Sequence, residues 1–318
     1  MRPTQGAALQ RKETMSRIHD ALKKAEQEKA AGIIPEGVSQ AGPAASGLPE
    51  SGLPSAAQAV ATGAPPEVGQ TDGATPLLKS ILERCAQSSW NPDKKTLLFS
   101  DGQHPVFGAE EFRTLRSHLY MIRDRQRLQK LLITSALPKE GKTFIAGNLA
   151  QVIVRQPGRR VLLIDGDLRL SQLHHRLGAP SQPGLSDYLR GEADEFSVVQ
   201  RGPFESLLFI AGGKQAPNPS ELIANGRLKL LLQRLGPAFD WVIVDSPPAI
   251  PVSDAKLLAD LCDGVLVVVH AGTTPYDLAR KVCQEFREKR LLGVVLNRAE
   301  AHSTYGSYYY YGGHAGKK

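Results

Sequence analysis

Residues Lys130–Thr143 read KLLITSALPKEGKT, a strand followed at once by a tight turn and the first residues of a helix. The strand, Lys130–Ser135, is apolar on both faces, which is typical of a strand buried inside a parallel sheet. The turn, Ala136–Thr143, brings backbone N–H groups to the positive end of the following helix, an arrangement that binds phosphate oxygens. The stretch therefore predicts a phosphate-binding loop at the carboxyl end of a buried strand.

The turn matches the P-loop pattern G-x-x-x-x-G-K-[ST] at every specified position except the first, which is Ala136. Gly141 allows the backbone to approach a phosphate closely. Lys142 reaches the β- and γ-phosphates, and Thr143 offers a hydroxyl to Mg²⁺. We therefore expect a nucleotide with Mg²⁺, held by the loop residues Pro138, Lys139, Glu140, Gly141, Lys142 and Thr143.

Apolar strands and helices alternate along most of the remaining chain, which predicts an α/β fold of the P-loop NTPase type. The mostly parallel sheet would be covered by helices on both faces, with ligands at the carboxyl ends of its strands. The further predicted strands are Thr96–Ser100, Arg160–Asp165, Leu207–Ala211, Trp241–Asp245, Gly264–His270 and Gly293–Asn297. The predicted helices are Leu77–Cys85, Gly108–Arg125, Thr143–Arg155, Asn218–Leu235, Asp254–Leu261 and Pro275–Arg290.

Acidic residues follow two of these strands. Trp241–Pro248, WVIVDSPP, ends its strand at Asp245, an arrangement that binds Mg²⁺ in P-loop proteins. Arg160–Arg169, RVLLIDGDLR, places Asp165 and Asp167 after another strand. We expect Asp165 and Asp245 to organise Mg²⁺ together with the loop hydroxyl, and Asp167 to orient or deprotonate a nucleophile. The alternative for Asp167 is a cap on the following helix.

The overall composition excludes several classes of protein. The 318 residues are 41% hydrophobic and 22% charged. No apolar run approaches the roughly 20 residues that cross a bilayer. Three cysteines without metal-like spacing predict reduced thiols in a cytoplasmic protein. A collagen, a coiled-coil rod, a disulfide scaffold and an integral membrane protein are excluded. The net charge of +7 permits anionic partners but does not require them, and we expect no nucleic acid.

Shifts in composition divide the chain into four segments. Residues 1–30 form an extension and a short amphipathic helix, Ser16–Ala30, with either Met1 or Met15 as the start. Residues 31–76 hold seven Pro and eight Gly without Lys or Arg, which predicts a disordered linker. Residues 77–300 carry the α/β pattern with all of its motifs. Residues 301–318 are a glycine-rich tail with a tyrosine cluster, namely Tyr305, Tyr308, Tyr309, Tyr310 and Tyr311.

The altered P-loop, the sequence I-D-x-D-x-R and the sequence D-S-P-P together resemble the bacterial tyrosine kinases, or BY-kinases. That family shares a branch of the P-loop proteins with the division-site and chromosome-partition ATPases. The resemblance spans Pro105–Arg298 and the tail. It includes four more stretches, namely Gly184–Gly191, Gly212–Ile223, Asp254–Ala259 and Gly293–Asn297. It implies a kinase that uses ATP and Mg²⁺, with Lys142, Asp165, Asp167 and Asp245 as catalytic residues. It also implies that Arg169 braces the phosphates or carboxylates and that Asn297 contacts adenine.

Two further features match the family residue by residue. Its oligomerisation motif E-x-x-R-x-x-R corresponds to Glu110, Arg113 and Arg116, which share one helix face suited to ion pairs with a neighbouring subunit. The alternative is an ordinary solvated face. The tyrosine cluster corresponds to the family's phosphoacceptor tail, which each subunit of a ring presents to the next active site. The alternative is a low-complexity tail without function.

The opening sequence SRIHDALKKAEQ resembles the start of kinases encoded with exopolysaccharide loci in exosortase-bearing Gram-negative bacteria. The resemblance implies a separate membrane partner, a polysaccharide co-polymerase adaptor, and a cytoplasmic protein located at the inner membrane through that partner. A tyrosine phosphatase is a further expected partner. Two alternative functions stay open, a partition-type ATPase without protein phosphorylation and a nucleotide-gated scaffold. Leu137, at the position of the partition ATPases' signature lysine, and the tyrosine tail argue against the first.

The adjacent residues His174 and His175 form the remaining candidate for a metal site. Because neighbouring residues of a helix point to different faces, we expect surface histidines rather than metal ligands.

Overall fold

The computed structural model describes residues 76–93, 96–98 and 108–299. The predicted N-terminal helix, the linker up to residue 75 and the five tail tyrosines lie outside the described residues, so the division of the chain into four segments stays a prediction. No helix within the described residues is both long enough and apolar enough to cross a membrane.

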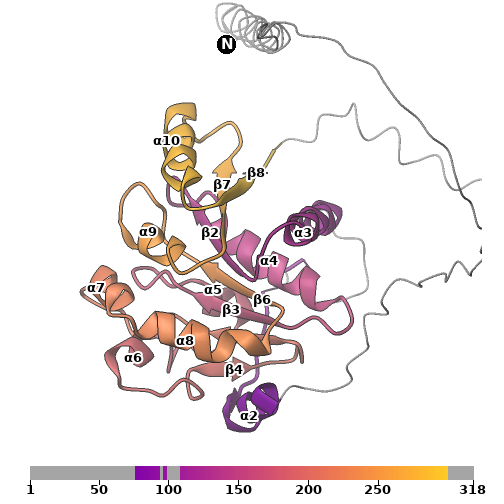
Figure 1. The fold of residues 1–318 in the computed structure, drawn as a ribbon, viewed down its shortest axis with the longest axis vertical. Coiled ribbons are helices and arrows are strands. Elements are labelled where there is room, and N and C mark those ends of the chain that lie inside the picture. Colours follow the sequence, from indigo (N-terminus) through magenta and orange to yellow (C-terminus); the bar gives the residue numbers. More distant parts are fainter. Residues whose placement is uncertain (1–75, 94–95, 99–107, 300–318) are drawn as a thin grey trace, which may run out of the picture. The chain divides into compact units, whose positions relative to one another are not determined.

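One sheet organises the described part of the chain, with the strand order β1-β4-β5-β3-β6-β2-β7-β8. Neighbouring strands are parallel throughout except for the antiparallel pair β4 and β5. Figure 1 shows β8 with α10 at one end of the sheet and β4 with α2 at the other. The strands are β1 (Ala86–Gln87), β2 (Lys130–Ser135), β3 (Val161–Asp165), β4 (Val199–Arg201), β5 (Leu207–Ile210), β6 (Trp241–Asp245), β7 (Gly264–His270) and β8 (Leu291–Asn297).

Helices cover both faces of this sheet. One face is packed by α3 (Ala109–Arg123), α4 (Lys142–Val154) and α5 (Leu173–Leu177). The other face is packed by α2 (Pro76–Arg84), α6 (Leu185–Arg190), α7 (Pro219–Ala224), α8 (Arg227–Leu235), α9 (Asp254–Ala259) and α10 (Tyr276–Arg287). A short 3-10 turn, η1 (Gly236–Ala238), follows α8. The predicted α/β fold, with a mostly parallel sheet between two helical layers, is therefore confirmed.

Strand β6 shows why the central strands are apolar at every position. Val242 and Val244 point into the core on the α8 side, whereas Trp241 and Ile243 point into the core on the α4 side. All four side chains are at most 2% exposed. Because successive side chains of a strand alternate between faces, a strand covered on both sides needs apolar residues throughout.

The order of the central strands places the motifs together. β3, β6 and β2 are neighbours, and Asp165 at the end of β3 pairs in register with Asp245 at the end of β6. β2 lies on the other side of β6 and leads directly into the phosphate loop and α4. All three strands are parallel, so their carboxyl ends form one edge of the sheet, where ligands bind in folds of this kind.

Two predicted elements differ from the structure. The strand predicted over Thr96–Ser100 is wrong for its described part, because residues 96–98 form a turn that Asn148 of α4 holds by hydrogen bonds to Thr96 O (2.9 Å) and from Leu98 N (2.7 Å). The single helix predicted over Asn218–Leu235 is two helices, because Gly226 adopts φ 83° between them. A left-handed residue ends one helix before the next begins.

Candidate active site

The phosphate loop turns sharply before α4. Lys139 and Gly141 both have positive φ, 67° and 101°. A Cβ atom on Gly141 would lie 2.1 Å from Nδ2 of Asn297, so the site has no room for a side chain there. Glycine at this position is therefore required by both the backbone conformation and the neighbouring amide.

Glu140 of the loop and two residues at or after the ends of β7 and β8 hold the loop in this shape. Glu140 is buried, and its carboxylate accepts a hydrogen bond from Leu137 N (2.7 Å) and one from the Thr274 hydroxyl. Asn297 at the end of β8 donates through Nδ2 to the Glu140 carbonyl (2.8 Å). Thr274 was missed by the sequence reasoning, and contact of Asn297 with adenine stays a prediction. What the structure assigns to Asn297 is the support of the phosphate loop.

Lys142 and Asp167 form a buried ion pair at the start of α4. Lys142 Nζ lies 3.1 Å from Asp167 Oδ2, and the two side chains are only 13% and 5% exposed. Lys142 Nζ also lies 3.5 Å from the buried Thr143 hydroxyl. Burial alone would lower the pKa of Lys142, but Asp245 and Asp167 raise it above its usual value. Lys142 is therefore a firmly protonated cation at the point where the P-loop pattern expects phosphate.

Asp165 is held by its own loop. Its Oδ2 accepts hydrogen bonds from Ser171 Oγ (2.7 Å), Gln172 N (3.1 Å) and Leu173 N (3.0 Å). Its Oδ1 accepts one from Asp167 N (3.2 Å). Burial and the neighbouring Asp245 carboxylate raise the pKa of Asp165 to about 7. These bonds fix the loop that carries Asp167, and the role of Asp165 as a metal ligand stays a prediction.

Asp245 contrasts with Asp165, although the two are neighbours in the sheet. Both of its carboxylate oxygens are buried and accept no hydrogen bond of good geometry, although the Thr143 hydroxyl and the Ser246 N–H lie near enough to lower its pKa. Burial raises the pKa of Asp245 to about 6, despite the opposing effect of the Lys142 cation. A buried carboxylate without well-placed donors is costly unless a cation or a proton compensates its charge. The site therefore fits a cation beside Asp245.

The side chains around Asp245 suit an Mg²⁺ ion that binds together with a nucleotide. In the described part of the chain no three acidic, histidine or cysteine side chains converge as a protein-only metal cage would require. Mg²⁺ in phosphate-transferring proteins is held by one or two side chains, with phosphate oxygens and water completing its shell. Asp245 and the buried Thr143 hydroxyl suit that arrangement.

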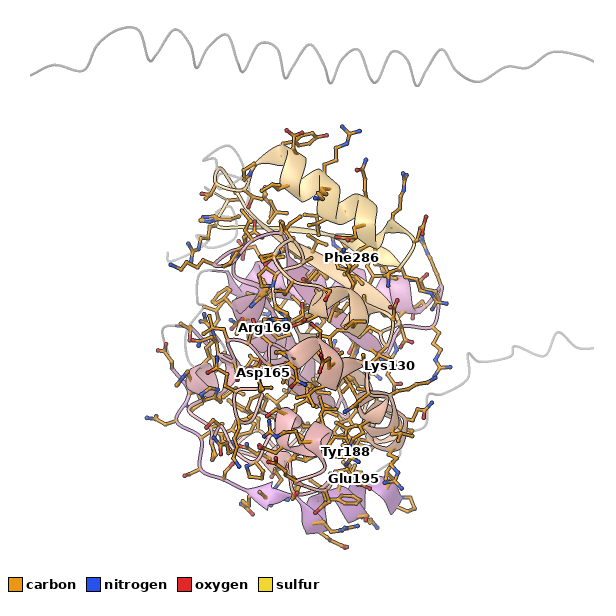
Figure 2. The ribbon with its side chains drawn as sticks, turned by 90° about the vertical axis from the view of Figure 1, so that its left-hand side faces the viewer. Lys130, Asp165, Arg169, Tyr188, Glu195 and Phe286 are labelled. Carbon is orange, nitrogen blue, oxygen red and sulfur yellow. The ribbon has the colours of Figure 1, made fainter. Side chains whose placement is uncertain are left out.

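Arg169 forms a second, distinct ion pair at the rim of the site. Its Nε and Nη2 bind the two oxygens of Asp254 at 2.7 and 3.1 Å, and Nη2 also reaches Ser220 Oγ (3.2 Å). Asp254 is fully buried, and the Asp254 hydrogen bond raises the pKa of Arg169. Figure 2 shows Asp165 and Arg169 close together, away from Lys130 at the start of β2. The guanidinium is thus bound to residues of α9 and α7, and its contact with the phosphates or with the carboxylates after β3 and β6 stays a prediction.

The histidine pair is not arranged as expected. The rings of His174 and His175 have centroids 3.9 Å apart, so the expectation of different helix faces is wrong for this five-residue helix. His174 Nδ1 lies 3.1 Å from Ser171 Oγ. Burial and the adjacent His175 lower the pKa of His174. His174 therefore extends the hydrogen bonds around Asp165.

The predicted oligomerisation residues divide into two kinds. Glu110 and Arg113 form an ion pair (2.6 Å) on the surface of α3, with side chains 75% and 51% exposed. Arg116 is half-buried and donates to the Val152 carbonyl of α4 (2.8 Å). The first two therefore lie open on the surface, whereas part of the Arg116 guanidinium is bound within the subunit, and the oligomerisation role of all three stays a prediction.

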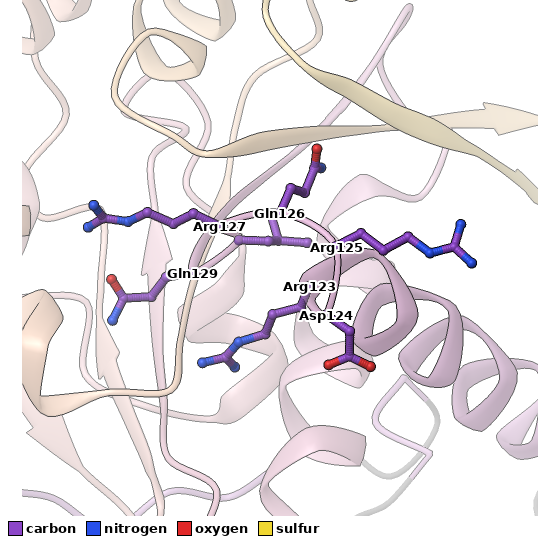
Figure 3. A pocket seen from close by; sticks show the side chains of 7 residues that line it. Arg123, Asp124, Arg125, Gln126, Arg127 and Gln129 are labelled. Atoms are coloured by element: carbon purple, nitrogen blue, oxygen red, sulfur yellow. The ribbon is translucent and has the colours of Figure 1, made fainter. Parts of the chain in front are cut away.

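Among the described residues, two open cavities lie at the amino ends of the strands, on the edge of the sheet opposite the phosphate loop. One, of about 510 Å³, surrounds the turn from Arg123 to Gln129 that precedes β2. Figure 3 shows the side chains of Arg125 and Arg127 pointing in opposite directions from this turn, so they do not converge on a ligand. The other, of about 540 Å³, lies beside Arg160 and Arg201 near α2. Neither cavity includes the phosphate loop or its aspartates.

The geometry at the carboxyl edge defines a P-loop nucleotide-binding protein with a general-base candidate beside its lysine. No protein-family model matches the chain. The chain is 34% identical to tyrosine-protein kinase YwqD of Bacillus subtilis over 204 residues, which cover 63% of this chain and 86% of YwqD. It is 30% identical to the putative tyrosine-protein kinase CapB of Staphylococcus aureus, covering 64% of this chain and 90% of CapB. Its match to the putative tyrosine-protein kinase AmsA of Erwinia amylovora, at 37% identity, spans only 26% of that longer protein.

Solved structures agree with these relatives. The chimerical protein CapA2B2 superposes with a TM-score of 0.60 at 31% identity, covering 70% of this chain and 97% of the other. The kinase domain of the Escherichia coli tyrosine kinase ETK superposes with a TM-score of 0.56 at 33% identity, covering 62% and 80%. The chain belongs to the bacterial tyrosine-protein kinases. It is a protein-tyrosine kinase, and its P-loop fold implies that it binds ATP.

Proposed function

We propose that this chain is an autokinase that transfers phosphate from ATP to the C-terminal tyrosine cluster of a neighbouring subunit. The observation that carries the proposal is the buried Lys142–Asp167 pair beside Asp245, whose carboxylate oxygens accept no hydrogen bond of good geometry. A cation for phosphate, a carboxylate able to accept a proton and a buried carboxylate available to Mg²⁺ are the groups that phosphoryl transfer requires.

The chain's own residues would bind the nucleotide as follows. The amides of residues 138–143 and Lys142 hold the β- and γ-phosphates. Thr143 and Asp245 hold Mg²⁺, with Asp165 as a further predicted ligand. When bound, Mg²⁺ neutralises charge that develops on the phosphate oxygens. Since Lys142 Nζ has a phosphate to bind in that state, its contact with Asp167 Oδ2 is replaced, and that oxygen is freed.

Asp167 then acts as the base for the acceptor. Its freed Oδ2 takes the proton of the tyrosine hydroxyl as the phenol oxygen attacks the γ-phosphorus. A bond forms between the phenol oxygen and that phosphorus, while the bond from the phosphorus to the β–γ bridging oxygen breaks. ADP leaves with the bridging oxygen, and phosphotyrosine is the product.

Assembly and regulation form the rest of the proposal. Glu110, Arg113 and Arg116 on α3 would close a ring in which each tail, residues 301–318, reaches the next active site. Each phosphate adds about −1.5 to −2 charges, so a multiply phosphorylated tail is repelled and the ring loosens. A separate membrane co-polymerase adaptor would recruit and activate the kinase at the inner membrane, and a tyrosine phosphatase would reset it. The process controlled is exopolysaccharide polymerisation and export, as the resemblance of the N-terminal sequence implies.

Peptide mapping by mass spectrometry after incubation with Mg²⁺ and ATP tests this proposal, with Lys142→Ala as the control. We expect phosphates on Tyr305 and Tyr308–Tyr311 of the wild type and none on the variant. In a mixture, wild-type chains should phosphorylate the tails of Lys142→Ala chains, because transfer occurs between subunits. If ATP is hydrolysed while every tail stays unmodified, in the presence of the adaptor as well, the autokinase proposal is wrong.

A further inference from the structure

The loop that carries Asp167 displays an apolar side chain to solvent. Leu170 is 67% exposed, whereas Leu168, two residues earlier in the same loop, is 3% exposed. Exposing most of a leucine forgoes much of the stabilisation that burial of such a side chain provides. Five other large apolar side chains are strongly exposed within the described residues, and none of them lies in this loop. They are Met121, Leu230, Tyr276, Val294 and Leu296.

The exposure of Leu170 is imposed by a fixed backbone. On one side of it, Arg169 is bound through two hydrogen bonds to the buried Asp254. On the other side, Ser171 Oγ donates to Asp165 Oδ2 at 2.7 Å. Because the side chains of both neighbours are anchored, one to Asp254 and the other to Asp165, the backbone between them is held and leaves the Leu170 side chain exposed at the rim of the site.

Leu170 is also tied directly to the candidate base. Its backbone N–H donates to Asp167 Oδ1 at 3.0 Å, while Lys142 occupies Asp167 Oδ2. The bond fixes the start of the Leu170 side chain within a few ångströms of the carboxylate that must receive the acceptor's proton. A phenol oxygen that reaches Asp167 Oδ2 therefore brings its aromatic ring to the same rim.

We propose that Leu170 is a specificity-determining residue that packs against the ring of the acceptor tyrosine. The inference rests on the proposed role of Asp167 as the base. Aromatic rings carry large apolar areas, and packing the ring on an aliphatic side chain whose backbone is already held in place lowers the conformational entropy that is lost. A serine hydroxyl offers no ring to this contact, so Leu170 favours tyrosine over aliphatic alcohols.

Steady-state kinetics with a synthetic peptide of residues 300–318 test the proposal. The enzyme is the full chain with Tyr305 and Tyr308–Tyr311 changed to Phe, so that the peptide is the acceptor that is followed. We expect Leu170→Ser to raise the KM for the peptide about fivefold to tenfold. Leu170→Met, which keeps an apolar side chain of similar size, should stay within about twofold. Leu230→Ser is the matched control, because Leu230 is 53% exposed on α8.

A second measurement separates ring contact from general damage. The affinity for a non-hydrolysable ATP analogue should be unchanged in all three variants, since the Leu170 side chain is not part of the phosphate loop. An unchanged peptide KM in Leu170→Ser overturns the inference, and so does an equal loss of affinity for peptide and nucleotide. If the enzyme with Leu170 intact phosphorylates the peptide, the proposed chemistry stands whichever result Leu170→Ser gives. If it phosphorylates no tyrosine, the proposed function fails and the inference fails with it.

Discussion

At the scale of single residues, the pair Asp165 and Asp245 makes the nucleotide-free protein sensitive to pH. Burial raises their pKa values to about 7 and about 6, from 3.8 for an exposed aspartate. Between pH 3.8 and the raised pKa values, these two carboxyl groups bind more protons in the folded state than in the unfolded state. Their contribution to the free energy of unfolding therefore falls as the pH rises from about 4 to 7, and it changes no further above that range.

Asp245→Asn tests this directly, because it removes one buried charge while keeping the shape of the side chain. We expect the free energy of unfolding at pH 8 to rise by about 2 kcal/mol, with a smaller change at pH 5. Urea unfolding without nucleotide at the two pH values is the measurement. Asp240→Asn is the control at the other end of β6, where the carboxylate pairs with Arg159 at 3.2 Å and accepts from Arg160 N. It should lower stability, and a loss of stability in Asp245→Asn as well would contradict the assignment.

At the scale of elements, the ion pair between Arg169 and Asp254 connects the loop after β3 to α9. A hydrogen bond from Arg169 to Ser220 connects the same loop to α7. Asp254 is fully buried, whereas the Arg169 side chain is 40% exposed. Removing the arginine leaves a buried charge without its partner, but removing the aspartate leaves a cation that can turn into water. We expect Arg169→Ala to lower the free energy of unfolding by about 3 kcal/mol and Asp254→Ala by about half as much. The double variant should be no less stable than Arg169→Ala alone, and additive losses in chemical denaturation would refute the coupling.

These contacts also show what the sequence could and could not predict. The central strands were predicted to within a residue or two, because strands buried on both faces are apolar at every position. The strands β1 and β4, with two and three residues, were missed, since so few residues show no pattern. The candidate carboxylates were found by their places after strands. The contacts between Arg169 and Asp254 and between Glu140 and Asn297 were not found, because the partners are 85 and 157 positions apart. Such pairs depend on the order of strands in the sheet.

At the scale of the whole molecule, the motif on α3 combines a surface that we propose for subunit assembly with an arginine that packs α3 against α4. Arg113 lies on the surface with Glu110, whereas Arg116 binds the Val152 carbonyl near the end of α4. An exposed ion pair within one helix contributes little to stability, but loss of a half-buried donor leaves the carbonyl unsatisfied. The two arginines should therefore respond differently to the same substitution.

We expect Arg113→Ala to yield smaller species than the wild-type oligomer in sedimentation velocity, while its free energy of unfolding changes by less than about 0.5 kcal/mol. Arg116→Ala should lower that free energy by about 1–2 kcal/mol, because the Val152 carbonyl loses its donor. Tail phosphorylation follows assembly in the proposed mechanism, so Arg113→Ala should also reduce it while leaving phosphorylation of a soluble tyrosine peptide intact. If Arg113→Ala sediments like the wild type, this face of α3 does not close the ring, and delivery of the tail must depend on another surface.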